Sequence, residues 1–128
     1  MIRVLLVDDR PAVRRGLRMR LALEPDILVA GEAEDGAAAL AVMRELRPDI
    51  VLMDAQMPRM DGFVATVALR AAFPDAAVVI LSLHDDLATR TQAAAAGAAA
   101  FLSKQASDTT LVAVLRGAAA RQLPTPTP

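Results

Sequence analysis

Length, composition and charge exclude several classes of protein. The 128 residues suffice for one domain with a buried core, and the absence of cysteine excludes disulfide frameworks and thiolate metal sites and favours a reducing compartment. A single histidine excludes zinc sites that need two, while a net charge of -1 and an aromatic fraction of 2%, without Tyr or Trp, disfavour nucleic-acid binding and platforms for stacking bases or flavins.

The N-terminal segment predicts a buried strand followed by a helix. Residues Ile2 to Val7 form a nearly continuous apolar run that stops at an aspartate pair, as expected for a parallel strand covered on both faces. Pro11 can occupy the first turn of a helix. Apolar residues then recur at every fourth position, which indicates an amphipathic helix: Val13, Leu17 and Leu21.

The same strand and helix pair recurs along the rest of the chain. Further strands are predicted at residues 27–30, 50–53, 78–81 and 99–102. Helices are predicted at residues 36–46, 61–73, 87–96 and 107–121. The second helix carries Leu40 and Met43, and the third carries Phe63, Val64 and Val67 as its apolar positions. Such alternation predicts an α/β fold with a parallel sheet and helices on both faces.

Helix-breaking residues fall between the predicted elements. Pro25, Pro48 and Pro74 each follow a predicted helix, and Gly97 can close the fourth one in a left-handed conformation. Residues 122–128 alternate proline with other residues and cannot continue a helix. We therefore expect a domain over residues 1–121 and the start of a linker after it.

No segment predicts a membrane span or a signal peptide. The longest apolar run, Ala93 to Leu102, is mostly alanine and far shorter than the ~18 residues that a span requires. Met1 is followed at once by a strand-like run that contains Arg3. We therefore expect no membrane association and a cytoplasmic location.

Polar residues stand at the carboxyl ends of four predicted strands, where ligands gather in open α/β sheets. They are Asp8 and Asp9, Asp54, Ser82, and Lys104. Each has an ordinary explanation by itself: the aspartate pair as a solvated turn or helix cap, the serine as a loop hydroxyl, the lysine as a surface side chain. Their joint placement at one edge of the sheet favours a functional site.

The chemistry of this set suits phosphoryl transfer. Three neighbouring carboxylates raise each other's pKa unless a cation is present, and an oxygen-only site suits Mg²⁺. Asp54 can attack phosphorus as a nucleophile, with Mg²⁺ and Lys104 neutralising the phosphoryl oxygens. Ser82 can donate a hydrogen bond to one of those oxygens.

Two further features have less certain meaning in the sequence. His84 lies two residues beyond Ser82 and is equally well explained as an exposed side chain. Four arginines cluster on the first predicted helix, and we interpret them as a solvated helix face rather than a binding patch: Arg14, Arg15, Arg18 and Arg20.

Four segments carry a resemblance to a known family. They are VLLVDD (residues 4–9), PDIVLMDAQMPRMDG (48–62), ILS (80–82) and AFLSK (100–104). On these segments the chain resembles the receiver domain of two-component response regulators, from Ile2 to about Arg121. The resemblance implies a flavodoxin-like fold, with a five-stranded parallel sheet of order 2-1-3-4-5, and a signalling switch instead of an enzyme.

The resemblance also implies an acceptor and a set of metal ligands. By position, Asp54 is the phosphoacceptor, which receives a phosphoryl group from a sensor histidine kinase. The implied Mg²⁺ ligands are Asp9 directly, Asp8 through water, Asp54 itself, and Gln56 through its backbone carbonyl.

A second group of implied roles concerns the switch. Ser82 and Lys104 sense the phosphoryl group, and Phe101 changes rotamer when Ser82 is drawn toward it. Gln56 and His84 flank the path of the attacking water and set the lifetime of the phosphorylated state.

Finer sequence features resemble the NarL/FixJ subfamily, whose members usually append a LuxR-type helix-turn-helix domain. These features are MDAQMP (53–58), LSLHDD (81–86), and a lysine that no proline follows. We expect the output to be transcription through a DNA-binding domain that these residues lack, and homodimerisation on phosphorylation is a further expectation. The alternative is a stand-alone receiver that acts by docking to another protein.

The sequence departs from the family pattern at two positions, and two other classes of protein fit it less well. Many receivers have Lys-Pro with a cis bond where this chain has Lys104-Gln105, and Leu83 is bulkier than usual beside Ser82. A magnesium-dependent phosphatase would need Asp-x-Asp after the first strand, which Asp8-Asp9-Arg10-Pro11 does not provide. A receiver-like module that no longer uses phosphate is disfavoured by the complete set of site residues.

Overall fold

Strands and helices alternate through the described residues, 1–58 and 60–122, of a computed structural model. The predicted linker beyond Gln122 lies outside them. The elements are β1 Ile2–Val7, α1 Pro11–Leu21, β2 Ile27–Ala33, α2 Gly36–Leu46, β3 Ile50–Asp54, α3 Gly62–Ala72, β4 Ala77–Ser82, α4 Leu87–Ala96, β5 Ala100–Ser103 and α5 Asp108–Gln122.

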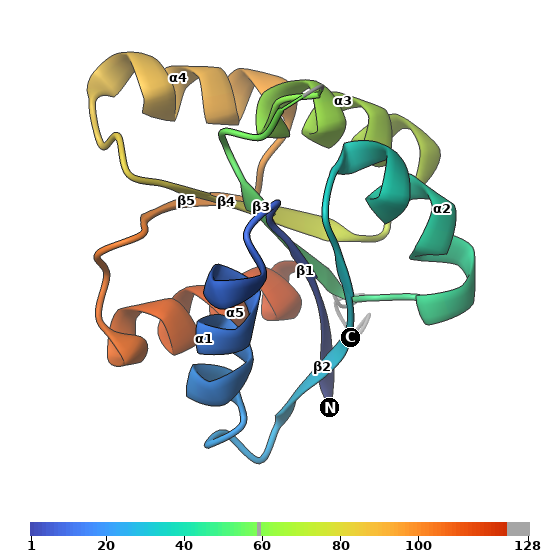
Figure 1. Cartoon of the computed structure of the whole chain (residues 1–128), viewed down its shortest axis with the longest axis vertical. Helices are drawn as coiled ribbons and strands as arrows, with labels where there is room; N and C mark the ends of the chain where they lie inside the picture. Colours follow the sequence, from blue (N-terminus) through green and yellow to red (C-terminus); the bar gives the residue numbers. More distant parts are fainter. Residues whose placement is uncertain (59, 123–128) are drawn as a thin grey trace, which may run out of the picture.

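The strands form one parallel sheet between two layers of helices. Its order is β2-β1-β3-β4-β5, as predicted. Helices α1 and α5 cover one face, and α2, α3 and α4 cover the other (Figure 1). Every residue of β3 and β4 is buried, because both faces of these central strands are covered. The apolar runs of the sequence are therefore explained by the layering.

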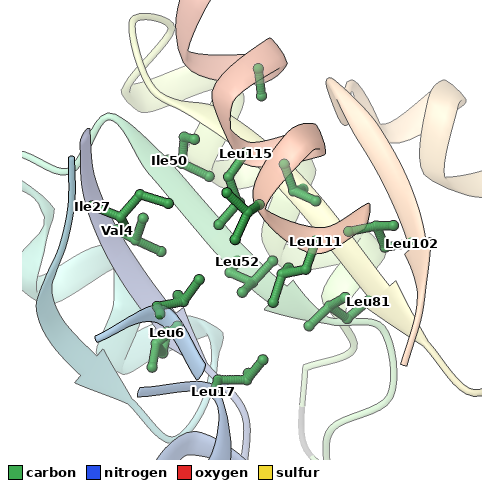
Figure 2. Packing of buried hydrophobic residues seen from close by; sticks show 14 of the residues in the cluster. Val4, Leu6, Leu17, Ile27, Ile50, Leu52, Leu81, Leu102, Leu111 and Leu115 are labelled. Carbon is green, nitrogen blue, oxygen red and sulfur yellow. The ribbon is translucent and has the colours of Figure 1, made fainter. Parts of the chain in front are cut away.

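The core consists of two clusters, one on each side of the sheet. Leu17 of α1 and Leu111 and Leu115 of α5 pack against alternate residues of the strands, such as Val4 and Leu52 (Figure 2). On the opposite face, Met43 of α2, Ala65 and Leu69 of α3, and Ala93 of α4 pack against Leu5, Val51, Met53, Val78 and Ile80. Alternation along each strand supplies both clusters.

Aspartates begin three of the helices. The side chains of Asp35, Asp61 and Asp86 accept hydrogen bonds from backbone N–H groups in the first turns of α2, α3 and α4, at 2.8, 2.8 and 2.7 Å. Gly97 ends α4 with φ 97°, so the predicted left-handed cap is confirmed. The described residues contain no cis peptide bond, so Lys104-Gln105 is trans.

The predicted apolar face of α3 is partly wrong. Val64 and Val67 are 54% and 56% exposed, whereas Ala65, Thr66 and Leu69 face the core. Compared with the predicted face, the helix is turned about its axis. Its first residue, Gly62, lies against the end of β3 and donates its N–H to Ala55 O at 2.9 Å. Small side chains then face the sheet at close range.

Strand and helix boundaries also differ from those predicted. Strand β2 continues three residues past the predicted end, because Gly31, Glu32 and Ala33 pair with β1 although the apolar run has stopped. Helix α5 includes Gln122, one residue past its predicted end. Among the described residues, no helix has the length and apolarity needed to cross a bilayer.

Candidate functional site

Three carboxylates meet at the carboxyl edge of the sheet. Asp8 and Asp9 follow β1, and Asp54 is the last residue of β3. Each offers an oxygen within 4.8 Å of the other two. Asp8 and Asp54 are 2% and 3% exposed, whereas Asp9 is partly exposed. The structure therefore brings together the three aspartates that the sequence singled out.

Lys104 places its ammonium group between two of these aspartates. Its Nζ lies 2.9 Å from Asp54 Oδ1 and 3.3 Å from Asp8 Oδ2, and its side chain is only 11% exposed. The backbone N–H of Lys104 donates to Ser82 O at 2.8 Å, which fixes the start of the β5–α5 loop beside the end of β4. Besides Lys104, the more exposed Arg10 brings its Nε to 3.8 Å from Asp8 Oδ1. Among the described residues, two cations face three carboxylates, so ionised carboxylates leave the cluster with excess negative charge.

The environment of Asp54 disfavours its charged form. Burial raises the pKa of this carboxyl group above its ordinary value, and the nearby charge of Asp8 raises it further. Lys104 opposes both effects through its hydrogen bond and its charge, without cancelling them. A cation held by the cluster would therefore stabilise the ionised carboxylate.

The loop after β3 folds back tightly over Asp54. Ala55 N donates to Leu81 O at 2.9 Å, and Gln56 N donates to Asp54 Oδ1 at 3.3 Å. A Cβ atom at Gly62 would lie 2.1 Å from Asp54 O, so only glycine permits this approach. The side chain of Gln56 is exposed.

Ser82 is buried at the same edge, in contact with the His84 backbone. In the sheet register Asp54 lies opposite Leu81, so Ser82 extends one residue beyond it. Ser82 is 1% exposed, and its Oγ accepts a hydrogen bond from His84 N at 3.0 Å. The side chain of His84 is exposed.

Phe101 is set back from this edge. It lies on β5 opposite Ile80, two residues before Ser82 along β4, and is half-buried. The guanidinium of Arg90 lies over its ring, 5.0 Å from the centroid. Phe101 thus lies on β5, beside β4 and under Arg90 of α4, and its switching role stays a prediction.

The sequence analysis did not predict the role of Arg14, which contacts Asp8, or that of its partner Glu32. Arg14 donates from Nη1 to Asp8 O at 2.6 Å and from Nε to Glu32 Oε1 at 2.9 Å. Its side chain is only 16% exposed, so the interpretation of the α1 arginines as a solvated face is wrong for Arg14. The spacing of Arg14 and Arg18 along one side of the helix is the signal that was available.

Comparison with known proteins shows the family. Residues 4–116 match the family described as the response regulator receiver domain. The chain belongs to this family. The predicted fold and family are thereby confirmed.

The relatives of this receiver include NarL-type regulators. The probable transcriptional regulatory protein NarL of Mycobacterium tuberculosis is 40% identical over 126 residues, which cover 98% of this chain and 58% of that protein. The receiver domain structure of the putative NarL from M. tuberculosis superposes with a TM-score of 0.87 at 39% identity, over 93% of this chain and 96% of that one. The predicted NarL-type subfamily is confirmed.

A relative of another kind shares the receiver as well. A protein-glutamate methylesterase/protein-glutamine glutaminase of Anaeromyxobacter dehalogenans is 44% identical over 105 residues, 81% of this chain and 31% of that protein. This receiver spans about half the length of the first curated relatives it matches. Receivers of this sequence type therefore occur in proteins with different names and lengths.

The donor set of the receiver fits Mg²⁺. Asp8, Asp9 and Asp54 offer carboxylate oxygens, the ligand type that this ion prefers, and the partly exposed Asp9 leaves access for water. Within the part of the chain that the structure describes, Lys104 is the one cationic partner of the buried Asp54, so the cluster needs further positive charge. Together the three carboxylates make a chemically suitable cation site.

Proposed function

We propose that this receiver is a phosphorylation switch in which Asp54 accepts a phosphoryl group from the phosphohistidine of a sensor kinase, in a Mg²⁺-dependent reaction. The observation that carries this proposal is the buried pairing of Asp54 with Lys104 at 2.9 Å inside a cluster of three carboxylates. A structural ion pair alone has no need for two further acids at the same edge. Phosphoryl transfer needs all of them.

Each site residue has a separate task in the transfer. Asp54 Oδ1 is held by Lys104 and by Gln56 N, so we assign the attack on phosphorus to Oδ2. The new O–P bond forms as the P–N bond of the phosphohistidine breaks, and the imidazole keeps the electron pair. The Lys104 ammonium then neutralises charge on the phosphoryl oxygens.

The cation ligands are assigned as Asp8, Asp9, Asp54 and the backbone carbonyl of Gln56. When bound, Mg²⁺ supplies positive charge to the phosphoryl oxygens and relieves repulsion among the carboxylates. Asp9 is assigned as a direct ligand and Asp8 as a ligand through water, while the Asp8 carboxylate stays anchored by Lys104, whose Nζ lies 3.3 Å from Oδ2.

The switch is proposed to begin at Ser82. Its Oγ accepts a hydrogen bond from His84 N, which leaves the hydroxyl proton available for a phosphoryl oxygen. The two charges added by the phosphoryl group favour one arrangement of Ser82, Lys104 and their loops. Rotation of Phe101 would carry this change to the face formed by α4, β5 and α5. Gln56 and His84 are proposed to control the lifetime of the phosphorylated state.

The output is proposed to be transcription, through a DNA-binding domain outside these 128 residues. NarL-type relatives named as transcriptional regulators support it. Homodimerisation on phosphorylation is part of this proposal, and the absence of cysteine from the sequence supports action in the cytoplasm. A second candidate, favoured by the methylesterase relative, is that the receiver controls an enzyme domain. A third is a stand-alone receiver that docks to another protein.

Incubation with acetyl phosphate and Mg²⁺, followed by intact mass measurement, tests the phosphoacceptor. Wild type should gain one phosphoryl group, and Asp54→Asn should gain none, because an amide is not a nucleophile of this kind. Asp75→Asn, an exposed aspartate at the opposite edge of the sheet, serves as the matched control and should be labelled as wild type. Undiminished labelling of Asp54→Asn, or none of wild type, contradicts the proposal.

A further inference from the structure

Every polar atom of Asp8 is engaged by another residue. Its N–H donates to Ala33 O at 3.1 Å, and its Oδ1 accepts from Arg10 N at 2.9 Å. Its Oδ2 lies 3.3 Å from Lys104 Nζ. The remaining atom, the backbone carbonyl oxygen, accepts a hydrogen bond from Arg14 Nη1 at 2.6 Å. The side chain of Arg14 therefore completes the fixation of Asp8.

Arg14 takes the place of a missing strand neighbour. The ladder between β1 and β2 ends at the pair Val7 and Ala33, after which β2 leaves the sheet. The N–H of Asp8 still reaches Ala33, but its carbonyl lies past the last residue of β2. A buried carbonyl needs a donor, and Arg14 supplies it from helix α1.

The same hydrogen bond controls the residue after Asp8. The carbonyl of Asp8 and the N–H of Asp9 belong to one planar peptide unit, so a bond that fixes the carbonyl also fixes this plane. Asp9 is the next residue, and its side chain is partly exposed. The direction of the Asp9 Cα–Cβ bond follows from this backbone, and the backbone is held by Arg14.

Arg14 is itself held in a network of charged groups. Its Nε donates to Glu32 Oε1 at 2.9 Å, and Arg18 donates to the other oxygen of Glu32 at 2.8 and 3.1 Å. The guanidinium has a planar set of donors, which lets Arg14 bind Glu32 and the Asp8 carbonyl at the same time. Glu32 therefore orients Arg14 toward the end of β1.

We propose that Arg14, oriented by Glu32, is a positioning residue for the cation site: it fixes the Asp8–Asp9 peptide so that the Asp9 carboxylate is directed for metal binding. The inference rests on the proposed function, because it concerns the Mg²⁺ that Asp8 and Asp9 are proposed to hold. It assigns a role to a helix residue that does not touch the ion.

The sign of the effect separates positioning from electrostatics. Arg14 contacts Asp8, so its positive charge lies beside the acidic site and by itself disfavours the binding of another cation there. Removing only that charge would tighten Mg²⁺ binding. Positioning gives the opposite result, because the Asp9 carboxylate loses its fixed direction when Arg14 is removed.

A magnesium titration of the folded, unphosphorylated protein tests this. Since the chain holds no Trp or Tyr, the titration is followed by amide NMR shifts, with no phosphodonor present. Arg14→Ala should weaken Mg²⁺ binding about tenfold, the lower range for residues that orient metal ligands. Arg14→Lys should restore part of the affinity, because one ammonium cannot serve both Glu32 and the carbonyl as a guanidinium does.

The matched control is Arg116→Ala. Arg116 of α5 has two acidic partners, Asp26 at 2.9 Å and Glu24 at 3.0 Å, and these pairs lie away from the aspartate cluster. Its loss tests whether a broken arginine network changes Mg²⁺ affinity through general destabilisation. The affinity of Arg116→Ala should equal that of wild type.

The outcomes distinguish this inference from the proposed function. If wild type binds Mg²⁺ and Arg14→Ala binds equally or more tightly, the positioning role is overturned and the switch proposal stands. If wild type binds no Mg²⁺, the proposed function fails and the inference falls with it. Should Arg14→Ala not fold, Arg14→Lys decides, because it keeps the positive charge: weaker Mg²⁺ binding than wild type supports the role, and unchanged affinity overturns it.

Discussion

Glu32 lies between two arginines of α1, and its ionisation is linked to folding. Burial raises its pKa, but hydrogen bonds from Arg18 and Arg14 outweigh burial and hold the pKa of this carboxyl below its usual 4.5. A carboxyl group with a lowered pKa in the folded state stabilises that state above its unfolded pKa. This contribution is lost as the pH falls through the folded value.

Glu32→Gln is expected to change the pH dependence of stability. At neutral pH the free energy of unfolding of the variant should be about 0.5–1 kcal/mol lower than that of wild type. The effect is small because Glu32 is partly exposed and solvent screens its ion pairs. Below the usual pKa of 4.5 the two proteins should converge. Urea unfolding measured from neutral pH to about pH 3 checks this, with the exposed Glu45→Gln as control. A gap that stays constant across this range contradicts the prediction.

At this scale the sequence identified the aspartates but not their support. Asp8, Asp9 and Asp54 are conspicuous because they stand where apolar runs stop, and the geometry brings them together. Arg14 and Glu32 are 18 positions apart, and neither interrupts a pattern. Their pairing depends on which side of α1 faces the end of β2, which helical periodicity alone does not determine.

The loop between β3 and α3 links the site to the rotation of a whole helix. Gly62 N donates to Ala55 O, and the first turn of α3 lies against the last residues of β3. This contact directs Ala65 and Leu69 to the sheet and leaves Val64 exposed. The sequence analysis named Val64 and Val67 among the apolar positions of this helix, and the pattern gives no measure of how closely the helix approaches the sheet.

Gly62→Ala is expected to disturb both packing and phosphorylation. The added methyl would meet Asp54 O at 2.1 Å, so the helix or the acceptor strand must shift, at a cost of about 1–3 kcal/mol. The unfolding temperature and the extent of labelling by acetyl phosphate should both be lower than in wild type. Gly16→Ala is the matched control, because a Cβ there meets nothing within 4 Å and alanine favours the helix by about 0.5–1 kcal/mol. Equal stability of the two variants contradicts this account.

The whole molecule places its chemistry at one edge of a layered sheet. Central strands covered on both faces must be apolar, so polar residues are confined to the strand ends, and parallel pairing brings the ends of β1, β3 and β4 together. The alternation of apolar runs therefore predicts the layers from sequence. The strand order came from the resemblance, because periodicity does not specify which strands are neighbours.

These 128 residues should take up phosphate yet show no specific affinity for DNA. The net charge is -1, and three of the α1 arginines are paired with carboxylates, Arg14 and Arg18 with Glu32 and Arg20 with Asp108. These pairs reduce the positive charge that α1 can offer to several phosphates, and none of the described helices is assigned as a recognition helix. Anisotropy of labelled duplexes, with the receiver unphosphorylated and acetyl phosphate-treated, should show only weak binding that salt suppresses.

The same proposal predicts what the native gene encodes after codon 128. A downstream helix-turn-helix segment would supply the missing contacts, and a protein containing it should bind DNA more tightly once Asp54 is phosphorylated. The Asp54→Asn form of that longer protein is the control, and it should not respond to acetyl phosphate. A stop codon directly after residue 128, or tight sequence-specific binding by the receiver alone, contradicts the division between switch and output.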